Sequence, residues 1–127
     1  MLDHVSIPVV DLERAAEFYD AVLGTLGFRR RKERPGAIGY GPATRRAPVF
    51  WILASAGERA RGGPGLHLSF QAADRSSVDA FHETALRHGG TDAGSPGLRP
   101  QYTMPFYGAF VLDPDGFKIE AVCRAED

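Results

Sequence analysis

Two histidines of this chain occupy equivalent positions of an internal repeat. When the second half is moved back by 63 residues (67 minus 4), His67 falls on His4, and residues 4–27 match residues 67–90 without a gap. Six of the 24 aligned pairs are identical, whereas ordinary composition gives about one or two. The identical pairs are His4/His67, Ser6/Ser69, Asp11/Asp74, Phe18/Phe81, Leu23/Leu86 and Gly27/Gly90. The chain therefore contains a duplicated module.

The repeat makes His4 and His67 candidate metal ligands. Imidazole is the commonest metal ligand in proteins and suits divalent first-row ions. A pseudo-twofold axis between the modules would bring both histidines to matching places on the wall of one cavity, so we expect them to bind one ion. A histidine without a counterpart in the repeat more often has a structural role or lies on the surface. We interpret His82 and His88 in that way.

Glu120 is the third candidate ligand. In the predicted strand 117–123, side chains alternate between two faces, and Glu120 shares its face with Lys118 and Val122. An unpaired carboxylate buried in a strand is costly. Either this strand lies at an edge with Glu120 in water, or Glu120 completes a set of two histidines and one carboxylate. Such a set leaves positions open for a substrate that binds through two atoms.

The elements that must position these residues can be read from the sequence. Asp11 and Asp74 stand where helix N-caps are expected, each after a short β run and before an amphipathic helix that ends at glycines. The other predicted strands are 37–41, 48–54, 107–112 and 117–123, with a Pro-Gly turn at 113–116 and a loop at 95–104. We therefore predict an α+β fold, a single domain over 1–127. It consists of two βαβββ modules, 1–61 and 66–127, joined by a linker at 62–65, whose curved mixed sheets surround a cavity.

Composition and charge narrow the possible partners. Fifteen basic and sixteen acidic residues give a net charge of −1, so nothing favours nucleic acid or an anionic membrane. The single Cys123 cannot form a disulfide within the chain. No apolar run approaches the roughly 20 residues that span a bilayer, and no leader segment is visible. We expect a cytoplasmic protein that binds a small molecule.

The ordered motifs of the chain resemble those of the vicinal oxygen chelate superfamily, which includes glyoxalase I, fosfomycin and bleomycin resistance proteins and extradiol dioxygenases. The resemblance covers essentially the whole chain and rests on residues 2–5, 10–14, 18–19, 23–24, 26–28, 65–70 and 110–120. It implies a glyoxalase-like fold, a homodimer, and one divalent ion (iron, manganese, nickel, zinc or cobalt). His4, His67 and Glu120 match three ligand positions of the metal-dependent members.

The fourth ligand position departs from the glyoxalase I pattern. In glyoxalase I, a second glutamate lies on the last strand of the first module, where this chain has Phe50 or Trp51. Neither side chain binds a metal, which disfavours lactoylglutathione lyase and leaves a lyase or isomerase, a dioxygenase or a transferase. The alternative is a metal-free protein that sequesters a small molecule, as bleomycin resistance proteins do.

Further candidates come from aromatic and charged residues near the predicted cavity. Phe50 and Trp51 are candidate substrate-binding residues, although Trp51 is equally consistent with a core residue. Arg99 could bind a substrate carboxylate or phosphate, or lie in solvent. Tyr102 and Tyr107 are candidates for substrate binding and, with Glu120, for acid–base catalysis. The charged run 29–34 is interpreted as an exposed strand edge.

Overall fold

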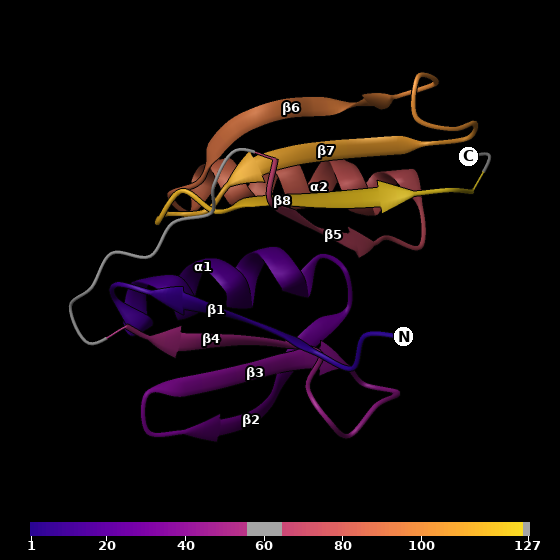
Figure 1. Ribbon diagram of the computed structural model, residues 1–127. Helices are drawn as coiled ribbons and strands as arrows, with labels where there is room; N and C mark the ends of the chain where they lie inside the picture. The colour runs from indigo at the N-terminus through magenta and orange to yellow at the C-terminus, as the bar shows by residue number, and fades with distance from the viewer. Residues whose placement is uncertain (56–64, 126–127) are drawn as a thin grey trace.

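The computed structural model describes residues 1–55 and 65–125 (Figure 1). Of the predicted linker at 62–65, only Gly65 lies within the described residues. The first module contains β1 (Val5–Val9), α1 (Leu12–Gly24), β2 (Phe28–Arg34), β3 (Ala37–Pro42) and β4 (Phe50–Ala54). The second contains β5 (His67–Gln71), α2 (Arg75–Arg87), β6 (Thr91–Leu98), β7 (Tyr107–Leu112) and β8 (Lys118–Cys123). The predicted order of elements, βαβββ twice, is confirmed.

The two sheets have the same topology. Their strand orders are β1-β4-β3-β2 and β5-β8-β7-β6. In each sheet the first strand of the module pairs in parallel with the last, and the other neighbours are antiparallel. Both sheets are therefore mixed and open, which confirms the predicted fold class.

The helices begin where the repeat predicts. The Asp11 carboxylate accepts a hydrogen bond from the Arg14 backbone N–H at 3.1 Å, and the Asp74 carboxylate accepts one from the Ser77 N–H at 2.8 Å. After α2, Gly89 adopts a φ of +95°, which glycine tolerates far better than other residues. These local interactions fix where each helix starts and where α2 ends.

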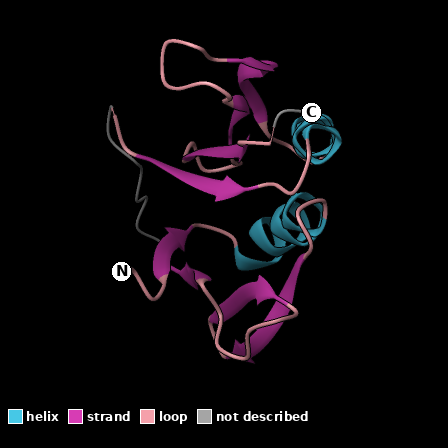
Figure 2. Ribbon diagram, turned by 90° about the vertical axis from the view of Figure 1, so that its right-hand side faces the viewer, coloured by secondary structure: helices cyan, strands magenta, loops and turns pink. Residues whose placement is uncertain are grey.

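One hydrophobic core joins the two modules. It includes Phe18 from α1 and Phe81 from α2, both fully buried. Figure 2 shows the two helices side by side on the same side of both sheets. Alternate residues of the strands, such as Ile7 of β1, point into this core. The sheet faces that carry His4 and His67 point away from this core. Each of these faces therefore lies on the outside of the chain.

A turn of the second module also binds the first. The Tyr19 hydroxyl of α1 donates to the Asp113 carboxylate at 2.6 Å, and both residues are buried. Asp113 also accepts hydrogen bonds from the backbone N–H groups of Asp115 and Phe117, each at 2.9 Å. Asp115 forms an ion pair with Arg14 at 2.7 Å. The turn predicted at 113–116 therefore also fixes the placement of the two modules.

Two edge strands differ in how well the sequence predicts them. The charged run 29–34 forms most of β2, which ends its sheet with mostly exposed side chains, as expected. The loop predicted to begin at 95 is wrong, because β6 continues through Pro96 to Leu98. β6 is the outer strand of its sheet, and a proline is tolerated on an edge strand. No helix among the described residues is long and apolar enough to cross a membrane.

Candidate functional site

His67 and Glu120 meet on the outer face of the second sheet. The parallel pairing of β5 and β8 sets Ser69 beside Glu120 and His67 beside Lys118. The His67 Nε2 atom lies 3.3 Å from the Glu120 Oε1 atom. The imidazole is 40% exposed, whereas the carboxylate is only 3% exposed. An accessible imidazole therefore lies beside a buried carboxylate.

The second carboxylate oxygen of Glu120 lacks a partner. Its Oε2 atom is buried and forms no hydrogen bond with any described residue. A Cβ added at Gly108 would lie 3.3 Å from this oxygen and 2.9 Å from the Phe106 ring, so glycine leaves the room that the carboxylate occupies. Leaving one buried polar atom without a hydrogen-bond partner costs about 1–3 kcal/mol, and more when the group is charged. The chemistry of this oxygen calls for a cation.

The separation of His67 and Glu120 fits two ligands of one ion. Ligands at about 2.0–2.2 Å from a tetrahedral ion lie roughly 3.3–3.5 Å apart. The observed 3.3 Å matches this spacing and exceeds the usual charge-assisted hydrogen bond of about 2.7–2.9 Å. No group of three metal-ligating residues occurs within residues 1–55 and 65–125. One chain thus brings two candidate ligands together at this point.

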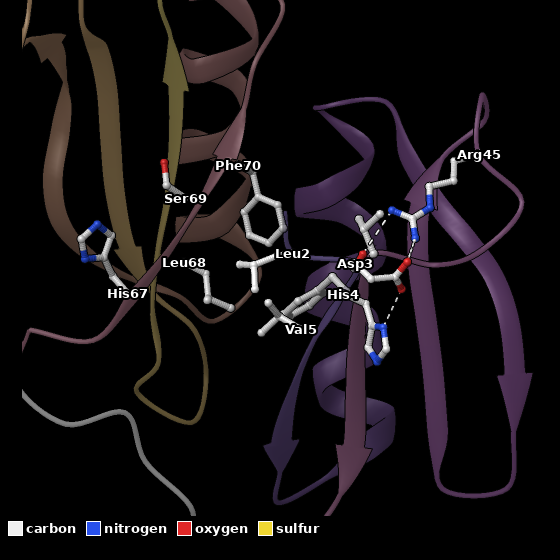
Figure 3. Close-up of a pocket in the computed structure, with 11 residues that line it drawn as sticks. Leu2, Asp3, His4, Val5, Arg45, His67, Leu68, Ser69 and Phe70 are labelled. Carbon is white, nitrogen blue, oxygen red and sulfur yellow. Dashed lines mark hydrogen bonds and ion pairs between the residues drawn. The ribbon is translucent and has the colours of Figure 1, made fainter.

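His4 lies apart from this pair. Both histidines border the pocket of Figure 3, on opposite sides, with Leu2, Val5 and Leu68 between them. The His4 Nδ1 atom is 2.8 Å from the Asp3 carboxylate, which in turn pairs with Arg45 at 2.8 Å. The hydrogen bond with His4 and the charge of Arg45 lower the pKa of Asp3. A carboxylate on one imidazole nitrogen is the usual support of a metal-binding histidine, and it leaves Nε2 free.

The strand register identifies the residue that replaces the fourth ligand. Ser6 pairs with Trp51 in the first sheet, just as Ser69 pairs with Glu120 in the second. Trp51 therefore occupies the repeat position of Glu120. It is 7% exposed, and the Arg34 guanidinium lies 4.7 Å from its ring centre.

Phe50 lies on the other face of its strand, in the core. Its ring centre lies 5.0 Å from that of Tyr19 and 5.5 Å from that of Phe70. The sequence could not choose between Phe50 and Trp51 as the counterpart of Glu120. The register does so, because neighbouring strand residues point to opposite faces.

Two residues predicted for the site, Tyr107 and Arg99, form hydrogen bonds with other groups of the chain. Tyr107 faces the helices, where its hydroxyl donates to Asp79 at 2.7 Å, and this bond raises its pKa. Glu120 pairs with Phe110, and strand alternation over three residues places Tyr107 on the opposite face. The Arg99 guanidinium donates to the backbone carbonyls of Ser95 and Gly97 at 2.7 and 2.9 Å. Tyr107 thus lies away from His67 and Glu120, whereas the Arg99 guanidinium lies 5.8 Å from the centre of the Phe110 ring, which packs against His67.

A cavity of about 350 Å³ surrounds the pair. Its lining residues are His67, Ser69, Tyr102, Phe106, Phe110, Lys118, Glu120 and Arg124. Tyr102 is present as predicted, 56% exposed, with its ring 5.1 Å from Phe106. The sequence carried a signal for two of the unexpected residues, since Lys118 alternates with Glu120 and Ser69 belongs to an identical pair of the repeat. Phe106, Phe110 and Arg124 gave no comparable signal.

Solved structures similar to this chain share its architecture. A glyoxalase/bleomycin resistance protein from Albidiferax ferrireducens T118 is 37% identical, with a TM-score of 0.87 over 98% of this chain and 99% of that one. Glyoxalase I from Zea mays is 23% identical, with a TM-score of 0.73 over 96% of this chain and 45% of that one. The second likeness shows the fold alone.

Sequence comparison agrees with the structural one. A protein described as a probable lactoylglutathione lyase from Synechocystis sp. is 29% identical and is matched over 94% of this chain and 92% of its own length. The sequence model of the Glyoxalase/Bleomycin resistance protein/Dioxygenase superfamily matches residues 1–121. This match spans nearly the whole chain, from the strand that follows His4 to the strand that carries Glu120, and the chain belongs to that superfamily.

Proposed function

We propose that this protein is a cytoplasmic, metal-dependent enzyme acting on a small molecule. His67 and Glu120 hold one divalent ion, and His4 from a second copy of the chain completes the ligand set. The observation that supports this most strongly is the buried Glu120 Oε2 atom, which has no partner among the described residues. The 3.3 Å separation of His67 and Glu120 supports it further.

A second copy is required because the chain presents its ligands on two outer faces. His4 and the His67–Glu120 pair both lie away from the helical core, and apolar side chains separate them (Figure 3). A homodimer that sets the first sheet of one copy against the second sheet of the other would form two equivalent sites. Sedimentation should therefore show a dimer at micromolar concentration, and a monomer would contradict the shared site.

The bound ion would supply Lewis acidity, stabilising negative charge that develops on neighbouring substrate oxygens. Two imidazoles and one carboxylate accept iron, manganese, nickel, zinc or cobalt. Glu120 is the ligand that can also exchange a proton with substrate, and Tyr102 at the cavity mouth is a candidate acid–base group. Trp51 offers neither a ligand nor a base, so an isomerisation that needs two carboxylates is disfavoured. A three-ligand dioxygenase or transferase fits the site better than lactoylglutathione lyase.

The second candidate function is metal-free sequestration of a small molecule. The aromatic residues Tyr102, Phe106 and Phe110, which line the cavity, favour it. The two functions differ in what Glu120 does. Sequestration requires no ion at the carboxylate, whereas the enzyme requires one.

Metal analysis separates the two functions. Protein purified without chelator, then dialysed against each candidate ion, should retain close to one equivalent per chain. His67→Ala and Glu120→Gln should each abolish this retention. His82→Ala is the matched control, because His82 also contacts a carboxylate, Asp92 at 2.8 Å, but lies on α2 away from the cavity. Retention far below one equivalent, or retention unaffected by the two site variants, would sink the enzyme proposal.

A further inference from the structure

We infer that the substrate carries an anionic group, a carboxylate or a phosphate, and that Lys118 and Arg124 bind it beside the His67–Glu120 pair. This inference names the substrate class of the proposed enzyme and uses the same cavity. It depends on the proposed function only for the reaction that follows binding.

Lys118 is placed to meet a ligand at this site. It pairs with His67 across β5 and β8 and shares the outer face with Glu120. Its ammonium nitrogen lies 4.7 Å from the centre of the Phe110 ring. No carboxylate pairs with it in the part of the chain that the structure describes. A lysine held over a ring without a counterion keeps its charge available to a ligand.

Arg124 provides a second cation at the same cavity. Its guanidinium carbon lies 5.0 Å from the centre of the Phe106 ring, and its Nη1 atom donates to the Thr103 hydroxyl at 2.7 Å. These contacts hold the group in place and use one nitrogen. The remaining N–H donors form a planar fork suited to two oxygens of a carboxylate or phosphate. Within residues 1–55 and 65–125, Arg124 has no carboxylate partner.

Two cations without a carboxylate partner among the described residues gather at this cavity. The protein as a whole carries a net charge of −1, and some arginines elsewhere pair with acids, as Arg14 does with Asp115 and Arg30 with Asp20. Around the cavity, Lys118 and Arg124 face a single carboxylate, Glu120, which the ion would neutralise. The site thus attracts anions although the chain is nearly neutral.

The exposed ring of the cavity defines the rest of the ligand. Phe106 and Phe110 are each 7% exposed and are covered by the two cations, whereas Tyr102, which lines the same cavity, is 56% exposed. The face of the Tyr102 ring suits a flat apolar group. The geometry therefore favours an aromatic or similarly flat acid over a compact hydrophilic anion.

The outer face of the first sheet also carries cations without carboxylate partners in the described part of the chain. Lys32, Arg34 and Arg46 line a cavity there with Trp51. None of these three cations pairs with a carboxylate among the described residues. In the proposed dimer this face of the second copy would add positive charge opposite Lys118 and Arg124.

Chemical-shift titration of chelator-treated protein tests the inference without any reaction. Benzoate and phenyl phosphate supply a flat anion of each kind, and benzamide supplies the neutral counterpart of benzoate. We expect both anions to bind at least about tenfold more tightly than benzamide, the factor that one charge-assisted hydrogen bond provides. Whichever anion binds more tightly identifies the acid group that the site prefers.

Variants assign the preference to the two cations. Lys118→Met and Arg124→Gln should each weaken anion binding about tenfold and leave benzamide binding unchanged. Arg87→Gln, which removes an exposed cation from the last turn of α2, is the control and should change nothing. Equal binding of benzoate and benzamide, absence of binding by both anions, or anion binding that both site variants leave unchanged would overturn the inference.

Metal retention by the same variants separates this inference from the proposed function. Lys118→Met and Arg124→Gln should keep the ion, because neither residue is a ligand. Anion preference in a protein that retains no metal would leave the inference standing and refute the enzyme proposal. Metal retention without anion preference would refute the inference alone.

Discussion

Replacing Glu120 by methionine should make the metal-free protein more stable. The Glu120 side chain is 3% exposed, and its Oε2 atom has no partner among the described residues. Methionine has a similar length and no charge, and the Phe110 ring beside it offers apolar contact. The imidazole of His67 loses its neighbour at little cost, because it is 40% exposed and water can solvate it.

The size of the effect follows from the burial of the charge. Replacing buried ionic groups by well-packed apolar ones is often neutral or stabilising by about 1–4 kcal/mol. We expect Glu120→Met to raise the free energy of unfolding by roughly 1–3 kcal/mol when no metal is present. A saturating ion reverses the order, since an ion at 1,000 times its dissociation constant stabilises the wild type by about 4.1 kcal/mol. The Glu120→Met variant lacks this metal ligand, so the ion should not stabilise it.

Urea unfolding with chelator and with added ion measures both parts of this prediction. Glu83→Met, at an exposed position of α2, is the control and should stay within about 0.5 kcal/mol of wild type in both conditions. A loss of stability in the metal-free Glu120→Met variant would refute the reasoning, because Glu120 would then stabilise the fold without an ion. An ion that stabilises wild type and variant equally would refute the assignment of Glu120 as a ligand.

Two further predictions concern residues that hold the site in place. Tyr19→Phe should lower the free energy of unfolding by about 1.5–3 kcal/mol, because buried Asp113 loses a charge-assisted hydrogen bond. Burial raises the pKa of Asp113 above 3.8. As the pH falls and Asp113 becomes protonated, the difference in unfolding free energy between wild type and Tyr19→Phe, measured by urea unfolding, should therefore shrink. A difference that grows at low pH would show that it does not come from the charged Asp113. Gly108→Ala should weaken metal binding at least about tenfold with an unchanged circular dichroism spectrum, since its Cβ would lie 3.3 Å from the Glu120 Oε2 atom. Unaltered metal affinity in this variant would show that the carboxylate does not depend on the space at Gly108.

The sequence predicts the modules because their determinants are local. The caps at Asp11 and Asp74 act within three residues, and the repeat marks both without any knowledge of packing. Local alternation also predicts which face of its strand carries Glu120. It leaves open whether that strand lies at a sheet edge, which is decided by the position of β8 between β5 and β7.

Relations between distant elements could not be predicted in the same way. Tyr107 lies near Glu120 in the fold but faces the other side, and only the register of β7 against β8 shows it. His4 and His67 are equivalent in the repeat. Their separation depends on how α1 and α2 pack into one core, which the repeat does not encode. Pro96 predicted a loop because proline is rare inside strands. It is accepted in β6 because β6 is an edge strand, and the sequence does not show which strands lie at the edges.

The most direct test of the shared metal site is the metal content of mixed dimers. Chains carrying His4→Ala and chains carrying Glu120→Gln should each retain no ion alone. A heterodimer of the two should regain one ion, because one site then combines His4 of one chain with His67 and Glu120 of the other, while the second site is doubly broken. Elemental analysis of the isolated heterodimer should therefore give one ion per dimer. No ion in the heterodimer, with one ion per chain in wild type, would contradict a site shared between two copies.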